Sequence, residues 1–462
     1  MTKTNILFPI ETINRELDFR LFLAAQYVSP RNRVFVGWHH TIHRLAQHSR
    51  GGVYLGQRVF STFPSSLARY ETLKRNGYIV MHLHEEGAVF AGDDEDWKKT
   101  LRRRLDPGVL CAEDYVCAWG DFQADYYRSL SPACAANIHV TGHPRLDLYK
   151  SRYREYFAPD AERLKKTYGD FILINSNFAL ANNENGIRQT FSAEGGYNPL
   201  DTQSRSYGIG VWAHAAHSLS NFMVLINQLI IDFPTTNIII RPHPSDDRGF
   251  FSHLFKGVRN VHVLHEGGVG PWLLASRMML HDGCTTGIEA FLCDVDIINY
   301  KSATDTRYDL FLPNIFGVQC HSQDEAMKAI RSLLEPRESA EPAQDLSDKA
   351  HSLLFNFKHD SFAKMTSVME EAEARARAKE SGVYNELPHR AHEWKDEMVT
   401  HAKSVVRPFF PERRLLHKSV RSRFYGFDKA DIDGKLKRIQ KILGKEIRCQ
   451  FHSKFLVSIE CD

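Results

Sequence analysis

Two polar turns near the middle of the chain combine residue types that bind and neutralise anions. They lie in the segments Asn237-Ile-Ile-Ile-Arg-Pro-His-Pro-Ser245 and Met279-Leu-His-Asp-Gly-Cys-Thr-Thr-Gly-Ile-Glu-Ala290. In each, an apolar run of strand length stops at Pro, Gly or small hydroxyl residues, which predicts a buried strand entering a turn. Arg241 offers a planar fork to phosphate oxygens, and His243, held between two prolines, offers a proton or hydrogen bond to a leaving phosphate. An alternative for His243 is a structural hydrogen bond to a neighbouring loop.

The second turn also predicts a helix start. Thr285-Thr286-Gly287 precedes a helix-length run, and the unpaired N–H groups and dipole at a helix start favour a phosphate or carboxylate. Asp282 is the candidate catalytic carboxylate of this turn. Glu289 and Ser245 complete the predicted substrate-binding residues of the two segments.

Acidic residues also follow two expected strands in the first third of the chain. Glu11 follows the first strand, and His84-Glu85-Glu86-Gly87 follows the fourth. Adjacent carboxylates repel each other and raise one pKa, which suits a general base, and either could instead act as a nucleophile. Neighbouring side chains of an extended segment point in opposite directions, so one glutamate faces the ligand and the other anchors the turn. Gly87 permits a sharp bend or a close approach to substrate, which favours Glu86, with Glu85 second. Helix capping or a solvated turn is the alternative.

Two further turns carry candidate substrate-binding residues. The strand at 170–177 ends in Asn175-Ser-Asn177, whose amides and hydroxyl suit a sugar or a base. His143 lies in a second Gly-His-Pro turn, within Thr141-Gly-His-Pro-Arg-Leu-Asp147. That turn also has a purely structural interpretation.

The elements that position these turns alternate between strand and helix. Strands are expected at 5–10, 33–38, 52–55, 78–83, 115–119 and 138–141, with helix-length segments between them. This βα alternation predicts a parallel sheet in an N-terminal, acceptor-side Rossmann-like domain over residues 1–150. No Gly-x-Gly-x-x-Gly follows the first strand, which argues against dinucleotide binding there.

A second βα series predicts a C-terminal, donor-binding Rossmann-like domain over residues 151–335. After 170–177, its strands are expected at 237–241, 261–264, 278–280 and 296–300, with a helix at 211–232. The polar segment 186–210 lacks periodicity and is expected to be a loop that acts as a lid. The expected fold class is therefore α/β, with two Rossmann-like domains facing a cleft that brings Glu86 opposite His243.

The C-terminal quarter has a different composition. A linker at 335–347 leads into a segment of high helix propensity, so 336–400 is expected to be helical and 401–462 to form a basic tail. Residues 401–450 contain fourteen Lys/Arg and five Asp/Glu, a local charge of 14 − 5 = +9. The tail either docks on an anionic membrane surface or packs on the protein's own surface.

Composition narrows the class of protein. The 462 residues are 43% hydrophobic and 25% charged with a formal charge of +3, typical of a soluble protein and too small to indicate nucleic-acid binding. Eight cysteines without a Cys-x-x-Cys pair argue against a zinc ribbon and favour reduced cytosolic thiols. The N-terminal apolar run is too short for a secretory signal, and no stretch of about 18 apolar residues predicts a membrane span. A cytoplasmic protein, peripheral to a membrane at most, is expected.

Several motifs together resemble the bacterial surface carbohydrate biosynthesis protein family over about residues 5 to 335. They are Ile-Glu-Thr-x-Asn-Arg-Glu-Leu-Asp (10–18), Glu-Glu-Gly (85–87), Ala-Trp-Gly (118–120), Thr-Gly-His-Pro-Arg-Leu-Asp (141–147), Ile-Asn-Ser-Asn-Phe (174–178), Arg-Pro-His-Pro (241–244) and His-Asp-Gly-Cys-Thr-Thr-Gly-Ile-Glu-Ala (281–290). The C-terminal motifs are also distantly similar to those of CDP-glycerol glycerophosphotransferases and β-Kdo transferases. These relatives imply a GT-B-like arrangement with the donor in the cleft.

The resulting expectation is a glycosyltransferase that uses an activated, nucleotide-linked sugar to build a cell-surface polysaccharide on a glycan or lipid-linked acceptor. Glu86 or Glu85 would act as base or nucleophile, and no metal or cofactor is required. Three alternatives remain: a polyol-phosphate transferase of the CDP-glycerol type, a sugar-nucleotide epimerase, and a non-catalytic sugar-nucleotide-binding subunit.

Overall fold

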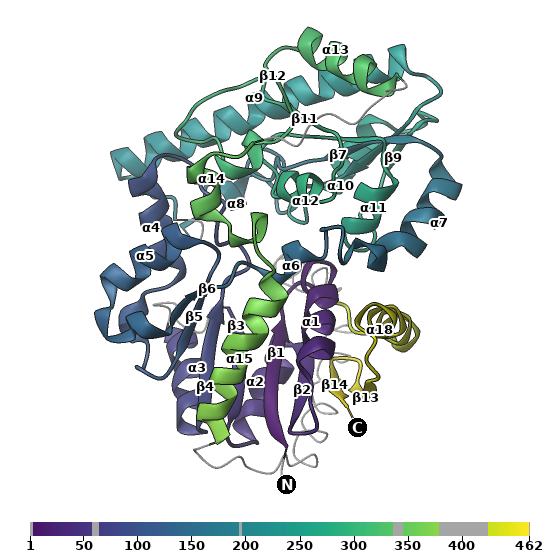
Figure 1. Ribbon diagram of the computed structural model, residues 1–462. Coiled ribbons are helices and arrows are strands. Elements are labelled where there is room, and N and C mark those ends of the chain that lie inside the picture. The colour runs from purple at the N-terminus through teal and green to yellow at the C-terminus, as the bar shows by residue number, and fades with distance from the viewer. Residues whose placement is uncertain (1–2, 58–63, 194–195, 336–344, 378–423, 462) are drawn as a thin grey trace, which may run out of the picture. The chain divides into compact units, whose positions relative to one another are not determined.

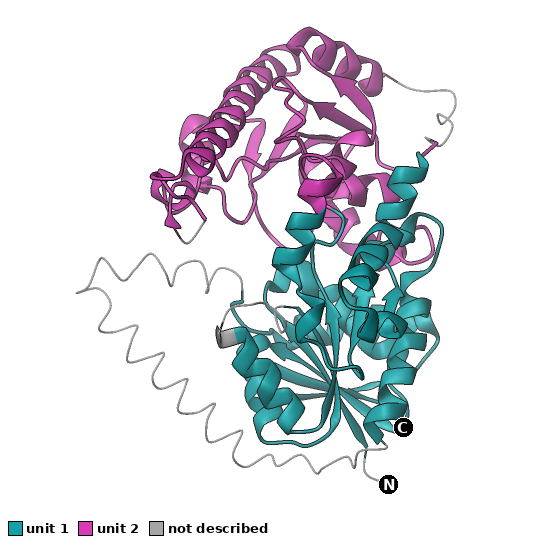
Figure 2. Cartoon of the chain, turned by 90° about the vertical axis from the view of Figure 1, so that its left-hand side faces the viewer, with its two compact units in different colours: residues 1–88, 98–148, 347–462 teal, residues 89–97, 149–346 magenta. Residues whose placement is uncertain are grey.

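The computed structural model describes two compact units, each built around its own β-sheet (Figures 1 and 2). The residues that it describes are 3–57, 64–193, 196–335, 345–377 and 424–461. Unit 1 comprises residues 1–88, 98–148 and 347–462. Unit 2 comprises residues 89–97 and 149–346. Against the expected boundaries, 89–97 belongs to unit 2 and the C-terminal residues belong to unit 1.

The sheet of unit 1 has eight strands in the order β13-β14-β2-β1-β3-β4-β5-β6. The bounds are β1 (Thr4–Ile10), β2 (Asn32–Trp38), β3 (Gly52–Gly56), β4 (Tyr78–Leu83), β5 (Tyr115–Ala118), β6 (Ile138–Val140), β13 (Arg448–Ser453) and β14 (Leu456–Glu460). β1 to β6 pair in parallel. Every residue of β1 and β4 is buried, the pattern of parallel strands covered on both faces.

Helices cover both faces of this sheet (Figure 1). They are α1 (Ile13–Tyr27), α2 (His39–Gln47), α3 (Pro64–Arg75), α4 (Asp94–Arg104), η1 (Pro107–Val109), α5 (Asp121–Leu130), η2 (Pro132–Asn137), α6 (Pro144–Asp147), α14 (Asp348–Leu353), η6 (Phe355–Phe357), α15 (Ser361–Arg377) and α18 (Lys429–Leu443). The chain returns to unit 1 after unit 2, and buried Asp147 fastens it there: its carboxylate accepts from Asn356 Nδ2 at 2.7 Å and from Phe362 N at 3.1 Å.

The C-terminal residues that the structure describes are part of the fold. β14 pairs antiparallel with β2, and Leu456, Val457 and Ile459 are fully buried. α18 packs on α1, where Lys435 Nζ lies 2.7 Å from Asp18 Oδ1. Residues 424–461 are therefore not a separate tail, because they complete the edge of the sheet. The remainder of the predicted tail, 401–423, lies outside the described residues.

The sheet of unit 2 has six strands, all paired in parallel, in the order β12-β11-β10-β7-β8-β9. The bounds are β7 (Phe171–Asn175), β8 (Asn237–Arg241), β9 (Val261–Val263), β10 (Met278–His281), β11 (Ile297–Tyr300) and β12 (Val318–Cys320). The predicted α/β class with two Rossmann-like sheets is confirmed. The expected strands are found, and β12 is an edge strand that the sequence did not predict.

The helices of unit 2 include one that corrects the expected lid. They are η3 (Arg154–Phe157), α7 (Ala158–Tyr168), α8 (Ile187–Thr190), α9 (Thr202–Asp232), α10 (Arg248–Leu254), α11 (Gly270–Ala275), α12 (Thr286–Leu292), η5 (Leu312–Ile315) and α13 (Gln323–Leu334). α9 begins nine residues before the predicted start at 211, because the Asp201 side chain accepts from Ser204 N and caps it. Residues 202–210 are thus helical, so the segment 186–210 is not the single loop that was expected to act as a lid.

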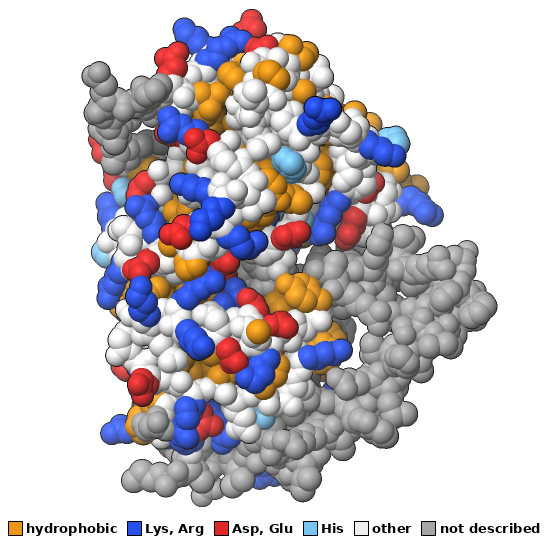
Figure 3. All heavy atoms as spheres, turned by 90° about the vertical axis from the view of Figure 1, so that its right-hand side faces the viewer, with side chains coloured by type: hydrophobic (Ala, Val, Ile, Leu, Met, Phe, Trp, Pro, Cys, Tyr) orange, Lys and Arg blue, Asp and Glu red, His pale blue; other side chains and the backbone are white. Residues whose placement is uncertain are grey.

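α9 is also long and apolar enough to cross a membrane by length and composition, contrary to the expectation that no segment qualifies. However, Phe222, Leu225, Ile226 and Leu229 in its second half pack into the core of unit 2. Other hydrophobic residues of α9, among them Val224 and Ile231, are exposed. On the face shown in Figure 3, Lys and Arg are interspersed with Asp and Glu, which fits the small net charge.

Candidate functional site

The carboxyl ends of four parallel strands bring polar residues to one edge of the unit 1 sheet. Glu11 follows β1, and Glu85 and Glu86 follow β4, as predicted. His39 starts α2 directly after β2, and Gln57 follows β3. Because the carboxyl ends of parallel strands share one edge, residues distant in sequence meet there.

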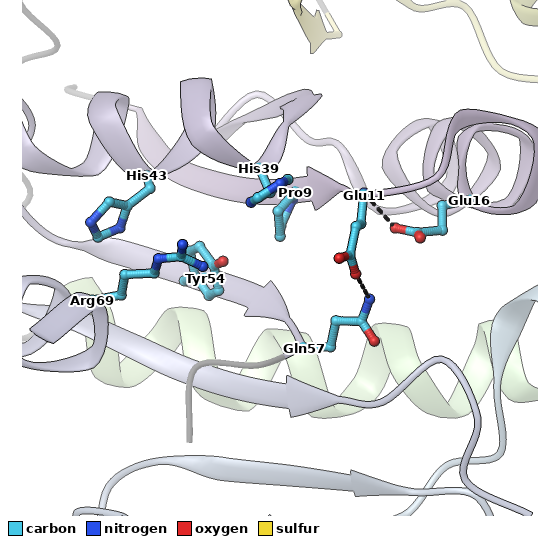
Figure 4. Close-up of a pocket in the computed structure, with 8 residues that line it drawn as sticks. All are labelled: Pro9, Glu11, Glu16, His39, His43, Tyr54, Gln57 and Arg69. Carbon is cyan, nitrogen blue, oxygen red and sulfur yellow. Dashed lines mark hydrogen bonds between the residues drawn. The ribbon is translucent and has the colours of Figure 1, made fainter. Parts of the chain in front are cut away.

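A pocket of about 130 Å³ opens at this edge. It is lined by Pro9, Glu11, Glu16, His39, His43, Tyr54, Gln57 and Arg69 (Figure 4). Glu11, Glu16 and Gln57 lie at one end, and His43 and Arg69 at the other. Of these residues the sequence predicted only Glu11. The others come from separate helices and strands, and no local pattern singles them out.

Hydrogen bonds hold the acidic end of the pocket in place. Gln57 Nε2 donates to Glu11 Oε2 at 2.7 Å, and Gln57 Oε1 accepts from Glu85 N at 3.4 Å. The Glu16 carboxylate accepts from the backbone N–H groups of Glu11 and Thr12, each at 3.0 Å, and so caps α1. Burial, reinforced by repulsion from Glu85, raises the pKa of Glu16 to about 7. The pocket and the Glu85 turn are thus one hydrogen-bonded unit.

Glu86 is the exposed member of the glutamate pair. Its side chain is 48% exposed, and its carboxylate lies 3.3 Å from Arg15 Nη1 and 4.0 Å from Arg104 Nη2. Arg15 also donates to Glu16, which lines the pocket. Glu86 is therefore an accessible carboxylate tied through one guanidinium to the pocket wall.

Glu85 is the buried member. It is 1% exposed, with Arg20 Nη2 at 3.5 Å and His143 Nε2 at 3.3 Å from its carboxylate. Arg145 Nη2 donates to its backbone carbonyl at 3.4 Å. Burial alone would raise the pKa of Glu85, but attraction to His143, Arg15 and Arg20 outweighs it and holds the pKa below the usual range. A buried carboxylate so surrounded is suited to anchoring the turn, and Glu86 is the exposed member of the pair.

His143, a predicted substrate-binding residue, is buried and packed in the structure. It is fully buried, its ring packs at 4.9 Å against both Phe19 and Trp119, and its Nδ1 accepts from Arg145 N at 3.1 Å. Its remaining nitrogen faces Glu85. The Gly-His-Pro turn therefore supports the buried Glu85 carboxylate.

Gly87 has a different use from the predicted one. A Cβ on Gly87 would lie 2.1 Å from Cδ1 of the Trp119 indole, whose Nε1 donates to His84 O at 2.7 Å. The close approach that requires glycine is thus to Trp119 and not to a substrate. Packing against this indole fixes the turn that presents Glu86.

The His243 turn follows β8 at the carboxyl edge of the unit 2 sheet. His243 N donates to Ser176 Oγ at 3.0 Å and to Asp246 Oδ2 at 3.1 Å. His243 Nδ1 accepts from Ser245 N at 3.2 Å, so in the neutral ring the proton is on Nε2. Burial raises the pKa of Asp246 to about 6. The turn holds His243 as a donor with a fixed tautomer, and Ser245 contributes its backbone to that role.

Arg241, the predicted phosphate fork, is turned towards the backbone. Its Nη1 donates to Glu266 O at 2.9 Å and its Nη2 to Gly267 O at 3.1 Å, and the guanidinium lies 5.0 Å from the centre of the Trp272 ring. Burial lowers its pKa to about 10. Arg241 thus braces the loop after β9, and its predicted contact with a phosphate stays a prediction.

Asp282 follows β10 and lies among charged residues that the sequence did not single out. Asp309 accepts from both sides, with His214 Nε2 at 3.2 Å and Lys301 Nζ at 2.8 Å. Burial raises the pKa of Asp282 to about 6, and nearby Asp309 adds to the shift. His214 was missed because it is an isolated polar residue in an apolar stretch of α9.

The other predicted residues of unit 2 divide into buried and accessible ones. Asn177 Nδ2 donates to Gly283 O at 3.1 Å, which places it at the Asp282 turn. Asn175 is 4% exposed at the end of β7, and its predicted ligand contact stays a prediction. A Cβ on Gly287 would lie 2.7 Å from His281 Cε1, so this glycine serves packing.

The predicted helix start is present. α12 begins at Thr286, with Thr285 and Thr286 half-buried in its first turn and Glu289 5% exposed. The ligand contacts of these three residues stay predictions. Among the residues that the structure describes, no group of three or more His, Cys, Asp or Glu could hold a metal ion.

No family model matches the sequence, and neither does any curated protein. Among solved structures, the chain is similar to UDP-GlcNAc 2-epimerase from Methanocaldococcus jannaschii, with 12% identity, a TM-score of 0.44 and coverage of 79% of this chain and 99% of that one. The UDP-GlcNAc 2-epimerase from Neisseria meningitidis is 13% identical, with a TM-score of 0.46 and coverage of 80% of this chain and 99% of that one. The wall teichoic acid polymerase TagF is 9% identical, with a TM-score of 0.44 and coverage of 80% of this chain and 88% of that one. The backbone of the chain is thus similar to those of UDP-GlcNAc 2-epimerases and of a wall teichoic acid polymerase, although the sequence identities are low.

Proposed function

We propose that the protein is a glycosyltransferase that moves a sugar from a nucleotide-linked donor to a glycan or lipid-linked acceptor in cell-surface polysaccharide synthesis. The observation that carries this proposal is the exposed Glu86 carboxylate, joined through Arg15 to Glu16 in the wall of the unit 1 pocket. An accessible carboxylate beside a pocket with hydrogen-bonding walls is what a hydroxyl acceptor requires.

In this proposal, the acceptor occupies the pocket and Glu86 takes the proton from its attacking hydroxyl. The acceptor oxygen then bonds to the anomeric carbon of the donor, and the bond from that carbon to the phosphate oxygen breaks. The nucleotide leaves with the bonding electrons. Arg15 and Arg104 hold the carboxylate in one orientation, so less entropy is lost when the acceptor arrives.

Unit 2 supplies the stabilisation of the leaving group. The turn fixes the tautomer of His243, and in this proposal its Nε2–H stabilises the negative charge that develops on the leaving phosphate. The turn that carries Asp282, Thr285 and Thr286 binds the donor in the same proposal. Arg241 acts only by bracing the neighbouring loop.

The unit 1 pocket with Glu86 and the His243 turn of unit 2 are two separate sets of groups, which favours a transfer between two substrates over epimerisation or simple binding. An epimerase or a nucleotide-sugar-binding subunit needs a single ligand, and the unit 1 pocket, with its own carboxylates, would then have no substrate of its own. Polyol-phosphate transfer also uses two substrates. It remains the second candidate because His243 would stabilise the negative charge on a phosphate in either reaction.

A screen for nucleotide release separates these classes. The full-length protein is incubated with nucleoside diphosphate sugars, CMP-Kdo and CDP-glycerol, with and without glycan acceptors. Acceptor-dependent release of nucleotide from a sugar donor is the expected result. Release of CMP from CDP-glycerol alone would assign polyol-phosphate transfer, and C2 inversion of the sugar without an acceptor would assign an epimerase. No release from any donor would contradict the proposal.

A further inference from the structure

The end of the unit 1 pocket opposite Glu11 is cationic. Arg69 of α3 and His43 of α2 line it together (Figure 4). Neither side chain has a hydrogen bond or ion pair with any other residue that the structure describes. Both are half-buried. A guanidinium in a pocket wall without a carboxylate partner is a group that still lacks its counter-charge.

Other arginines around the same edge of the sheet differ from Arg69 in this respect. Arg15 contacts Glu16 and Glu86, and Arg20 contacts Glu85. Partly burying a cation costs free energy unless an anion or hydrogen-bond acceptors compensate for it. Because no described residue supplies a counter-charge to Arg69, its position points to a ligand that brings one.

His43 adds a neutral donor to this end. Burial, with repulsion from Arg69 and His40, lowers the pKa of His43 to about 4, so the imidazole is neutral at pH 7. A neutral imidazole donates one N–H and accepts at the other nitrogen. A ligand anion would thus meet the full charge of Arg69 and a hydrogen bond from His43.

The polarity of the pocket changes along its length. The Tyr54 ring and Pro9 form the wall between the two ends, and the Glu11 carboxylate with the Gln57 amide forms the far end. Carboxylate and amide oxygens accept hydrogen bonds from hydroxyl groups and repel anions. The matching ligand is anionic at one end and hydroxylated at the other.

We propose that this pocket binds an acidic sugar unit of the acceptor, with its carboxylate or phosphate on Arg69 and His43 and its hydroxyls towards Glu11 and Gln57. The proposal rests on the proposed function, which it deepens by naming the acceptor as an acidic glycan. The planar guanidinium fork fits either a carboxylate or a phosphate, so both sources share one chemistry.

The test is equilibrium binding by calorimetry on the full-length protein without a donor. The probes are hexuronates and hexose 6-phosphates of the gluco, galacto and manno series, each compared with its neutral hexose. At least one acid is expected to bind about tenfold or more tightly than its neutral counterpart, the usual scale of a charged hydrogen-bonded pair. Preference for the uronates or for the phosphates identifies the source of the anion. Equal or absent binding of acids and neutral sugars overturns the proposal.

Variants locate the binding. Arg69→Gln is expected to abolish the preference for the acid, and Arg69→Lys to restore part of it. Arg31→Gln is the matched control, because Arg31 is an exposed arginine directly before β2, at the opposite end of that strand from the pocket. If Arg69→Gln does not fold, His43→Ala is measured and is expected to weaken binding of the acid only. An unchanged preference in the folded variants overturns the proposal.

The outcome is separable from that of the proposed function. Sugar binding is measured without turnover, so an inactive donor screen leaves the binding result standing. Conversely, acceptor-dependent nucleotide release with no acid preference would retain the transferase and reject this pocket assignment. If Arg69→Gln weakens binding of UMP or CMP instead, the cationic end serves a nucleotide and the inference fails.

Discussion

Arg15 Nη1 lies 3.3 Å from Glu86 Oε1, while Nη2 of the same guanidinium lies 3.1 Å from Glu16 Oε1. An isolated surface ion pair contributes only about 0–1 kcal/mol to stability. Here the ion pair has a positioning role, because the Arg15 guanidinium joins the exposed Glu86 carboxylate to the buried Glu16 carboxylate in the pocket wall. The orientation of Glu86 relative to the pocket is thus set within unit 1.

Replacing Gly87 by alanine should lower turnover without removing any reacting group. The added Cβ would lie 2.1 Å from the Trp119 ring, so the turn must shift and carry Glu86 with it. A displacement of about 1 Å near the reacting atoms costs on the order of 100-fold in kcat. Gly434→Ala is the control, since a Cβ there meets nothing within 4 Å. Unchanged kcat in a folded Gly87→Ala protein would show that the position of the turn does not matter.

Replacing His243 by alanine should slow the chemical step. Loss of one fixed donor to a developing oxyanion typically costs about 100-fold or more in kcat. His253→Ala, an exposed histidine on α10, is the matched control and should retain turnover. The rates are compared in single-turnover experiments. Full activity in a folded His243→Ala protein rules out this role.

Replacing Asp246 by asparagine should change how stability depends on pH. Burial raises the pKa of Asp246 to about 6 in the folded protein, against about 3.9 in an unfolded chain. Between these values the folded state binds more protons than the unfolded state, so this carboxyl is most stabilising at low pH and its contribution is lost as pH rises to 6. Asparagine does not titrate in this range.

The stability of Asp246→Asn relative to wild type should therefore rise by about 2 kcal/mol between pH 4 and pH 7, because one pKa unit corresponds to about 1.4 kcal/mol and the unfolded carboxyl is already about half ionised at pH 4. Urea unfolding at both pH values measures the difference. Asp247→Asn serves as the exposed control. A difference that is independent of pH would mean that Asp246 is not held protonated by the fold.

The basic C-terminal segment should bind anionic membranes through charge. Deleting 401–462 would not test this cleanly, because β14 and its buried Ile459 belong to the unit 1 sheet. Neutralising Arg413, Arg414 and Lys418 to glutamine changes no residue of β13 or β14. Each basic residue near an anionic bilayer contributes about 1 kcal/mol, so liposome affinity should fall strongly at low salt and little at high salt. If the full-length protein ignores anionic liposomes at low salt, the segment has no membrane role.

The strands were predictable because their pattern is local. Ile238 to Ile240 and Met278 to Leu280 are apolar runs cut off by Pro or Gly, and all six residues are fully buried. The turns after them were predictable for the same reason. What each side chain contacts was not: Arg241 and Arg69 are both arginines near strand ends, yet one is bonded to carbonyls and the other lines a pocket.

The start of α9 shows why propensity misled. Residues 202–210 contain Gly208 and Gly210, which disfavour a helix. In the fold, Tyr197 packs on the face of Gly208 and Tyr308 on that of Gly210. These tertiary contacts outweigh the local preference, and they are not visible in a sequence window.

The pocket and the C-terminal hairpin were missed for a topological reason. His43 and Arg69 are ordinary polar residues of two amphipathic helices, and only the pairing of β1 with β2 and β3 brings both helices to one edge. Likewise, the alternation in Leu456-Val-Ser-Ile459 fits a strand, but its partner β2 lies more than 400 residues earlier.

The most direct test of the account compares Glu86→Gln with Glu85→Gln, measuring donor affinity and turnover separately. Glu86→Gln should fold normally and bind donor like wild type, because Glu86 is exposed, but lose nearly all turnover. Glu85→Gln should lower the melting temperature, because it removes the charge that Arg20 and His143 surround. If Glu86→Gln retains wild-type turnover, Glu86 is not the catalytic carboxylate and the central claim fails.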